Sequence, residues 1–371
     1  MTEWRDCKFG EIATFSYGKM PNKKNIVDCG YPIFSGYKIV GYYNSYMYED
    51  PQLIIVARGV GGTGDVKISP PKSYITNLSI IAEVHPGKAN KKFLYYYFKI
   101  NNLRELDSGS AQSQITINDL NNYCITLPPL PEQKAIAEVL SSLDDKIDLL
   151  TRQNKTLEDL AQAYFRKWFI EDASDEWEVG KAENYFEIGI GKTPPRKEEH
   201  WFSKNKDDVV WISISDMGKS GMFIGDSSEY LTEDAVRRFN IKRVPKGAII
   251  LSFKLTVGRV AIALREFTTN EAIAHFIYKN DYEREYLYFY LKTFDYYSLG
   301  STSSIATAVN SKIIKDMPFI MPNIEALQKY HKIAAPIFSK IEYNTNQILT
   351  LQKLRDTLLP KLISGEIRVK M

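Results

Sequence analysis

Three glycines, Gly59, Gly61 and Gly64, follow the apolar run 53–56 in the spacing G-x-G-x-x-G. In dinucleotide-binding proteins this spacing joins a strand to a helix whose N-terminal amides hold the pyrophosphate. Here an alternating, strand-like stretch follows and ends at Pro70 and Pro71, which exclude that helix. A nucleotide-binding enzyme that uses loop 59–64 is therefore kept only as the alternative function. Saturable NAD or ATP binding by the isolated chain would reveal it.

Two further segments contain fragments of catalytic motifs. The segment "GIGKTPPR" (189–196) ends like a phosphate-binding loop, but Phe186 stands where the first glycine belongs and two prolines prevent the helix. The letters of a nuclease motif, Glu132-Gln133-Lys134, stand at the start of a helical pattern, where an acidic residue favours the helix dipole. Neither segment predicts catalysis.

The remaining residue types with chemical potential are scattered. The double prolines do not form the N/D-P-P-Y/F loop of adenine methyltransferases, and no G-x-S-x-G elbow occurs. The histidines have no matching positions in the two halves of the chain: His85, His200, His275 and His331. Three cysteines without C-x-x-C spacing indicate neither a disulfide framework nor a zinc site. We expect no catalytic residue and no metal site.

Composition adds limits on the class of protein. The chain has 371 residues, 44% of them hydrophobic and 25% charged, which is typical of a globular protein with two or more domains. A formal charge of +3 means that any basic surface must be local. The N-terminus has no secretory apolar region and no apolar run approaches 18 residues, so we expect a cytoplasmic protein without membrane contact.

Comparison of the chain with itself reveals two diverged copies. "YGKMP" (17–21) matches "IGKTP" (190–194), and "LYYYFK" (94–99) matches "LYFYLK" (287–292). Thr76-Asn77 matches Thr269-Asn270, and "SGSAQSQI" (108–115) matches "LGSTSSIA" (299–306). Each match is weak alone, but their common order indicates an internal repeat.

Each copy ends in a long helical pattern. The first runs without Gly or Pro from Glu132 to Phe169, and its apolar residues recur every seven positions. The second repeats the pattern at an offset of 194 residues, contains Pro336, which we expect to kink or interrupt it, and stops at Gly365. The expected seam of the helix pair consists of Ile136, Leu143, Leu150, Leu157, Tyr164, Ile337, Leu351 and Leu358.

The segments before these helices are short β-branched and aromatic runs broken by Gly, Asn and Pro, typical of α+β domains. We predict an α+β domain over residues 1–130, a long helix over 131–172, a second α+β domain over 173–321, and a second long helix with a tail over 322–371. Each helix would pack against the other, because an isolated helix with an apolar seam needs a partner.

Polar and basic loops occur at similar places in both α+β domains. Lys and Arg suit phosphates and guanine edges, Gln and Ser can bond base edges, and glycine allows close backbone approach. We therefore expect DNA contacts from these loops. In the first domain they are Lys19, Lys23, Lys24, Arg58, Gly61, Gln112, Ser113 and Gln114. In the second domain they are Lys192, Arg196, Lys197, Lys254, Arg259, Ser301, Thr302 and Ser303.

The segment "PPLPEQKAIAEVLSSLDDKIDLL" (128–150), with its echo "LQKLRDTLLPKLISGEIRV" (351–369), resembles the DNA-specificity subunit of type I restriction-modification systems. The resemblance implies two target-recognition domains separated by an antiparallel pair of long helices, with pseudo-twofold symmetry. Each domain would read one half of a bipartite target in double-stranded DNA, and the helices would set the spacer between the halves.

The same resemblance implies a non-catalytic subunit without a cofactor of its own. Two methyltransferase subunits, which use S-adenosylmethionine, would dock on the helices, and restriction subunits would supply translocation and cleavage driven by ATP with Mg²⁺. The second helix departs from the family pattern, because Asn323 to Gln328 replace the P-E-Q-K opening. The two docking faces are therefore not expected to be equivalent.

Overall fold

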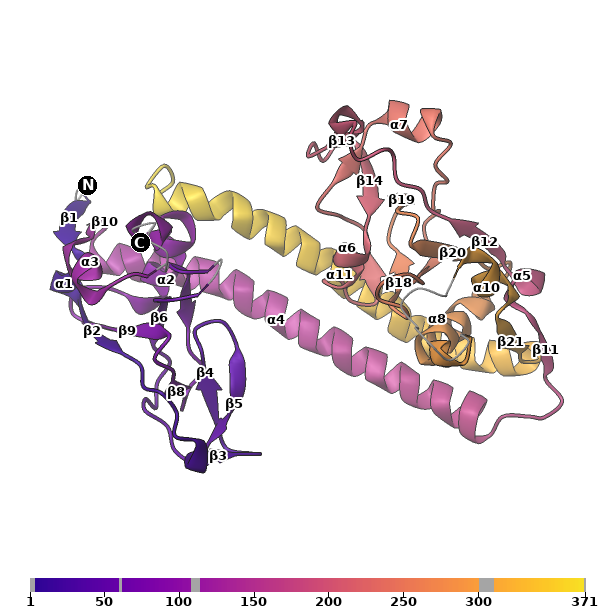
Figure 1. Ribbon diagram of the computed structural model, residues 1–371, viewed down its shortest axis with the longest axis horizontal. Helices are drawn as coiled ribbons and strands as arrows, with labels where there is room; N and C mark the ends of the chain where they lie inside the picture. Colours follow the sequence, from indigo (N-terminus) through magenta and orange to yellow (C-terminus); the bar gives the residue numbers. More distant parts are fainter. Residues whose placement is uncertain (1–3, 60–61, 108–113, 300–309, 370–371) are drawn as a thin grey trace. The chain divides into compact units, whose positions relative to one another are not determined.

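The computed structural model describes residues 4–59, 62–107, 114–299 and 310–369. The chain forms two compact units, one of residues 1–148 with 350–371 and the other of residues 149–349. Each unit contains one α+β domain and part of each long helix (Figure 1). The predicted α+β class and the internal repeat are both confirmed.

The first domain is built on two four-stranded sheets. One has the antiparallel order β2 (Ala13–Tyr17), β9 (Ser79–Val84), β6 (Leu53–Val56), β7 (Val66–Ile68). The other has the order β3 (Ile26–Val27), β5 (Ile39–Tyr43), β4 (Tyr31–Phe34), β8 (Tyr74–Ile75), in which β4 and β8 are parallel. A further antiparallel pair joins β1 (Arg5–Lys8) to β10 (Cys124–Leu127).

The second domain repeats this topology and adds one strand at the edge of its larger sheet. Its larger sheet has the order β12 (Glu187–Ile190), β20 (Ile273–Ile277), β17 (Ile249–Ser252), β18 (Val260–Ala263), β15 (Phe223–Ile224). Its smaller sheet has the order β13 (Phe202–Ser203), β16 (Tyr230–Leu231), β14 (Val209–Ile212), β19 (Thr268–Thr269), again with one parallel pair. The pair β11 (Glu178–Lys181) and β21 (Pro318–Met321) corresponds to β1 and β10.

The strand registers correct one match made from the sequence. The Thr76 amide donates to the Phe34 carbonyl, and the Asn270 amide donates to the Ile212 carbonyl, each at 3.1 Å. These carbonyls occupy equivalent places at the ends of β4 and β14, so Thr76 corresponds to Asn270 and not to Thr269. Both segments contain the dipeptide Thr-Asn, so the sequences alone favour an alignment that is wrong by one residue.

A close backbone approach explains the repeated Gly-Lys pairs. A Cβ atom on Gly18 would overlap the carbonyl of Thr76, and a Cβ on Gly191 would overlap the carbonyl of Asn270. The matched Gly-Lys and Thr-Asn segments therefore contact each other within each domain. Glycine is needed at both places because a larger residue would separate the two loops.

The two long helices are α4 (Leu130–Arg166), which continues as a π-helical turn to Glu171, and α11 (Ile324–Ile363). Pro336 does not interrupt α11, so the expected interruption is wrong. The proline is exposed and removes one backbone hydrogen bond, which packing on both sides of it compensates. Gly365, with a φ of +77°, follows the last turn of α11 as expected.

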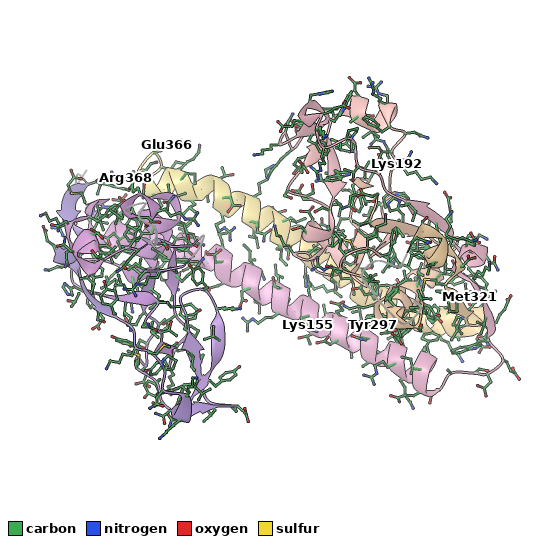
Figure 2. The ribbon with its side chains drawn as sticks, in the orientation of Figure 1. Lys155, Lys192, Tyr297, Met321, Glu366 and Arg368 are labelled. Carbon is green, nitrogen blue, oxygen red and sulfur yellow. The ribbon has the colours of Figure 1, made fainter. Side chains whose placement is uncertain are left out.

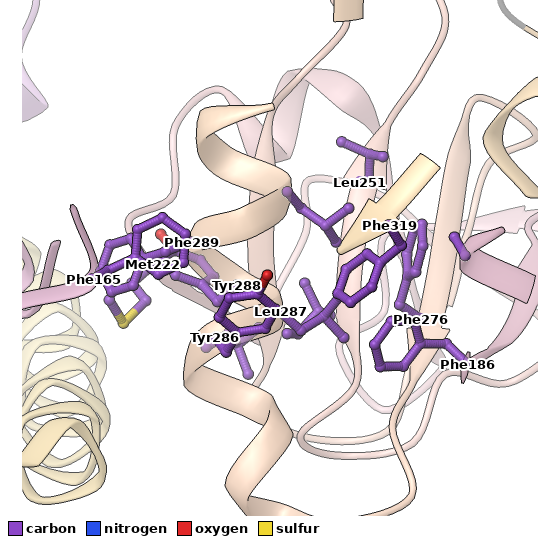
Figure 3. Close-up of a cluster of buried hydrophobic side chains, with 14 of the residues drawn as sticks. Phe165, Phe186, Met222, Leu251, Phe276, Tyr286, Leu287, Tyr288, Phe289 and Phe319 are labelled. Atoms are coloured by element: carbon purple, nitrogen blue, oxygen red, sulfur yellow. The ribbon is translucent and has the colours of Figure 1, made fainter. Parts of the chain in front are cut away.

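The helices share a core with the domain in each unit. In the second unit, α8 (Arg284–Thr293) packs its aromatic face on Phe165 of α4 and on Phe338 of α11. Figure 3 shows the part of this cluster that contains Phe165 and the α8 aromatic residues. In the first unit, α2 (Lys91–Ile100) packs with Ile136 of α4 and Leu362 of α11. In both units the two helices run antiparallel.

The opening of α4 has a structural role. Gln133 is buried, donates to the Pro128 carbonyl and accepts from the Asn90 amide, each at 2.9 Å. Glu132, also buried, forms an ion pair with Arg368, which lies beside Glu366 in the C-terminal tail (Figure 2). Glu132 and Gln133 of the P-E-Q-K segment therefore connect α4 to the C-terminal tail and to the start of α2.

The seam between the helices is partly as expected. Ile136 and Leu150 are buried, whereas Tyr164 is 38% exposed and lies outside the seam, which is a correction. Ala161 and Phe165 take its place, because a straight α-helix drifts by about 20° per seven residues. The remaining expected seam residues are half-buried: Leu143, Leu157, Ile337, Leu351 and Leu358.

One position of this seam is polar. Asn344 of α11 is fully buried and donates to Oδ1 of Asn154 on α4 at 2.9 Å, and Asn154 donates to Thr345 at 3.3 Å. The Oδ1 atom of Asn344 has no partner in the part of the chain that the structure describes. A buried asparagine in a helix pair favours one register, since other registers would bury the amides unpaired.

Candidate nucleic-acid interface

In each domain the larger sheet brings basic loops to one edge. In the first domain, β2 and β6 are both antiparallel to β9, so their C-terminal ends meet at the edge where β9 begins. Lys19 follows β2 and Arg58 follows β6. The Lys19 amide donates to the Ile75 carbonyl at 3.0 Å and the Arg58 amide to the Leu78 carbonyl at 3.3 Å, which joins both loops to the segment before β9.

The second domain has the same arrangement. Lys192 follows β12 and Lys254 lies just beyond β17, and both strands are antiparallel to β20. The Lys192 amide donates to the Thr269 carbonyl at 3.0 Å, and the Phe253 amide donates to the Ala272 carbonyl at 2.9 Å. Lys19 thus corresponds to Lys192, and all of these cations are exposed.

The turns after β6 and β17 are equivalent as well. Gly64 and Gly258 have φ angles of +91° and +90°, and each donates its amide at 2.9 Å to the last residue of the preceding strand. Counted from those strand ends, Arg58 and Lys254 are both the second residue. The Arg58 and Lys254 correspondence was not recognised in the sequence, because the turns differ in length; the shared glycine was the available signal.

This geometry also decides the role of the glycine-rich loop. β7 follows Gly64 and pairs antiparallel with β6, so the described residues after the loop form a hairpin strand and not a helix. A Cβ on Gly64 would come within 2.7 Å of the backbone of Leu103 and Arg104. The glycine serves this close packing, and the nucleotide-binding alternative lacks the helix it requires.

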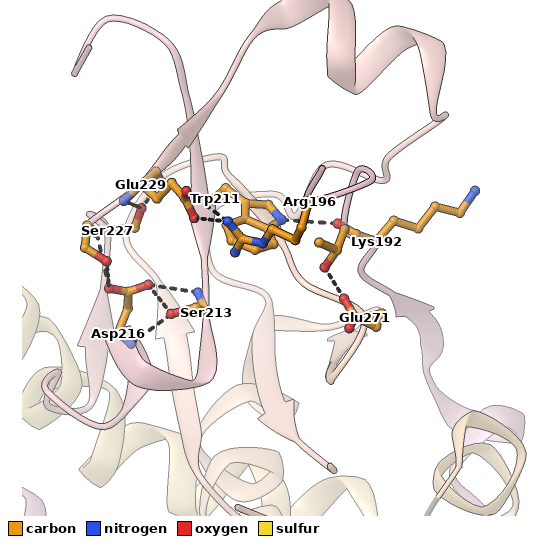
Figure 4. Close-up of polar contacts among 10 residues, drawn as sticks. Lys192, Arg196, Trp211, Ser213, Asp216, Ser227, Glu229 and Glu271 are labelled. Carbon is orange, nitrogen blue, oxygen red and sulfur yellow. Dashed lines mark hydrogen bonds and ion pairs between the residues drawn. The ribbon is translucent and has the colours of Figure 1, made fainter. Parts of the chain in front are cut away.

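Arg196 remains exposed but is held by contacts within the second domain. Its guanidinium carbon lies 4.3 Å from the Phe202 ring centroid and 4.6 Å from that of Trp211, and it donates to both carboxylate oxygens of Glu229 (Figure 4). Lys192, by contrast, extends away from this cluster, with Nζ 3.1 Å from the Phe239 carbonyl oxygen. Through the aromatic stacking and the ion pair, Arg196 contacts both β13 and β14 and stabilises their packing.

Arg259 also makes a hydrogen bond within the second domain. It donates from its guanidinium to the Ile214 carbonyl at 2.6 Å, at the short helix α6 (Ile214–Met217), and it corresponds to Asp65 in the first domain. Asp216 of α6 is buried, which raises its pKa, but hydrogen bonds from Ser213 and Ser228 outweigh burial and hold the pKa below its usual value. A charged Asp216 therefore fixes α6 beside the edge loops.

The other expected DNA contacts are distributed around the same loops. Lys23 and Lys24 lie in an exposed 3₁₀ turn (Lys23–Asn25), and Lys197 is exposed next to Arg196. Gln114 is half-buried, and its amide donates to Asp107 at 3.2 Å. The remaining expected contacts lie outside the described residues: Gly61, Gln112, Ser113, Ser301, Thr302 and Ser303.

Two kinds of site are not found in the described ranges. No group of three or more His, Cys, Asp or Glu side chains there could hold a metal ion. The helices within those ranges also lack the combination of length and hydropathy needed to cross a membrane.

Comparison with known proteins supplies the class. The family model described as the type I restriction modification DNA specificity domain matches residues 1–159 and 174–355. The MjaIX specificity subunit of Methanocaldococcus jannaschii is 30% identical over 308 residues, covering 75% of this chain and 69% of that protein. The HindI specificity subunit of Haemophilus influenzae is 25% identical, covering 73% of this chain and 74% of that protein.

A solved structure agrees in fold. The type I restriction-modification S subunit from M. genitalium is 18% identical, with a TM-score of 0.63, and the match covers 99% of this chain and 96% of that one. The chain belongs to the type I restriction-modification DNA specificity family. This membership confirms the resemblance seen in the sequence and the expectation of a non-catalytic specificity subunit that associates with modification and restriction subunits and with DNA.

Proposed function

We propose that each domain reads one half of a bipartite DNA target through the loops at the edge of its larger sheet. The observation that carries this proposal is the pairing of exposed cations at equivalent places: Lys19 with Lys192 and Arg58 with Lys254. Cations that recur on two otherwise diverged domains suit the one ligand both domains would share, the phosphate backbone.

The helix pair is proposed to set the distance between the half-targets. Each domain shares a hydrophobic core with both helices, so each domain is fixed to the helix segments of its own unit. The buried Asn344, hydrogen-bonded to the half-buried Asn154, favours one register of those segments. Spacing between half-targets would then follow helix length.

The exposed faces of the helices are proposed to dock two methyltransferase subunits. Leu149 and Leu160 of α4 are 41% and 46% exposed, and the residues 194 positions later, Tyr343 and Leu354, are 56% and 44% exposed. In the second unit a shallow groove between the helices is lined by Leu149, Leu157 and Lys340 among others. Exposed apolar stripes repeated on both helices suit a partner that binds twice.

The chemistry is assigned to the partners. In this proposal the chain carries no cofactor, methyltransferase subunits use S-adenosylmethionine to methylate adenine, and restriction subunits use ATP and Mg²⁺. The chain would act in the cytoplasm, on the host chromosome and on entering DNA.

Salt-dependent DNA binding of the assembled modification complex tests the edge loops. Two double variants, K19A/R58A and K192A/K254A, should each weaken binding to all duplexes. Each should reduce the slope of log affinity against log salt by roughly two, since each lost phosphate contact removes about 0.9.

The matched control is K92A/K279A. Lys92 lies beside Lys91, whose ammonium bonds the Pro51 carbonyl before the start of β6, and Lys279 lies just beyond the far end of β20. These exposed lysines are at the opposite end of the sheets from the edge loops, so the control should keep the parental slope. Equal slopes for the parent and both test variants would remove the edge loops from the DNA footprint.

A further inference from the structure

Leu255 combines two unusual features. Its side chain is 81% exposed, more than any other large apolar side chain in the described ranges, and its φ is +62°. A φ in this left-handed region is unfavourable for a γ-branched residue and is ordinarily filled by Gly, Asn or Asp. Burial of the Leu255 side chain does little to offset this backbone strain, and an uncompensated outlier of this kind points to a functional position.

The turn that presents Leu255 is rigidly built. The Thr256 amide donates to the Lys254 carbonyl at 2.7 Å, and the Ser252 hydroxyl donates to the Thr256 carbonyl at 2.6 Å. The amides of Gly258 and Arg259 donate to the Ser252 carbonyl and hydroxyl at 2.9 Å and 3.0 Å. Leu255 therefore projects from a preformed tip and does not need to be ordered on binding.

The position of this tip indicates the occupant. Leu255 follows Lys254, one of the edge-loop cations, and Gly258 places the turn as Gly64 places its counterpart. An apolar side chain held beside a phosphate-binding cation is the arrangement by which proteins insert a wedge between stacked base pairs. In the first domain the third residue after the strand is Gly59, which has no side chain, and the two residues after it lie outside the described ranges.

Resting on the proposed DNA reading, we propose that Leu255 inserts into the base stack of the half-target read by the second domain. It would unstack one base step there, so that this half-target is recognised partly through the ease of unstacking. The half-target read by the first domain would stay stacked apart from the adenine that the methyltransferase extrudes.

Permanganate oxidation of unstacked thymines tests this proposal. The probe is a plasmid that carries the bipartite motif recovered by sequencing methylated host DNA, bound by the assembled modification complex. The parent should give reactive thymines opposite both methylated adenines and one further reactive step in a single half-target. L255G, which also relieves the backbone strain, and L255N, which tolerates the left-handed φ, should lose the further step and bind the motif roughly tenfold more weakly.

Controls separate the possible outcomes. L255M keeps an apolar side chain and should retain the further reactive step. The midpoint temperature of thermal unfolding of L255G should be no lower than that of the parent. An unchanged permanganate pattern in L255G, or weakened methyltransferase association with unchanged DNA binding, would overturn the wedge. If K192A/K254A still flattens the salt slope in that case, the proposed DNA reading stands alone; if it does not, both fail.

Discussion

At the scale of residues, buried polar side chains hold the loops that form the edge of each sheet. His275 is a clear case: it is 2% exposed on β20, and its Nε2 lies 2.6 Å from the Thr269 hydroxyl. Burial, with a smaller contribution from Lys242, lowers the pKa of His275 from 6.5 to about 4. The folded domain therefore holds a neutral imidazole at neutral pH.

This titration predicts how stability depends on pH. Between pH 6.5 and about 4 the unfolded chain binds a proton at His275 and the folded chain does not, so stability is complete above pH 6.5 and falls as the pH drops. Between pH 7 and pH 5 the loss should be roughly 2 kcal/mol. H275Q keeps a hydrogen-bonding side chain without the proton and should lose correspondingly less. Denaturant unfolding of both proteins at the two pH values measures the difference, and equal losses would show that His275 does not titrate as described.

Residue roles were the least predictable feature of the sequence. Lys19 and Lys192 were matched because a Gly-Lys pair is visible in the letters. The commitment of Arg196 was not visible, because Glu229 lies 33 residues away and becomes its partner only through the pairing of β14 with β16. The local sequence around a loop cation does not show whether a carboxylate distant in the chain pairs with it.

At the scale of elements, the long helices were predicted well because their signal is local and periodic. The start of α4 near Glu132 and the glycine stop of α11 both follow from single residues. Strand registers were harder to predict from the sequence. The correspondence of Thr76 with Asn270 is defined by the carbonyl groups that their backbone amides bond, which the sequence does not show. Tyr164 lies outside the seam because a straight α-helix has 3.6 residues per turn, whereas the predicted seam assumed 3.5.

If helix length sets the distance between the half-targets, as proposed, then shortening the helices should shorten the unread spacer of the DNA target. Deletion of residues 145–151 together with 347–353 removes seven residues from each helix and retains both the Asp144–Arg355 and the Asn154–Asn344 contacts. At ~1.5 Å per helical residue the separation shortens by about 10 Å, or about three base pairs at ~3.4 Å each. Sequencing of methylated sites should show the same half-targets with a spacer shorter by about that amount. An active variant with the parental spacer would show that helix length does not set the distance.

At the scale of the whole molecule, the chain consists of two copies of one α+β domain, each followed by a long helix. Both domains have the same strand order, the same parallel pair in the smaller sheet, and the same glycine contact behind the first basic loop. They differ in detail: β15 and the helix Glu233–Arg238 occur in the second domain, and Leu255 stands where the first has Gly59. The repeat was readable in the sequence, but what each copy recognises depends on loop geometry and DNA shape.

Exchange of the second domain is the most direct test of the two-reader account. Residues 177–320 are replaced by the corresponding segment of another specificity subunit, and both long helices are kept, with the Phe165 and Phe338 contacts to the domain matched in the donor. Methylated adenines are then mapped across a host genome that carries the hybrid system. If each domain reads its own half-target, one half-target becomes that of the donor, while the other half-target and the spacer remain those of the parent. A methylated motif in which both half-targets change, or neither does, would contradict it.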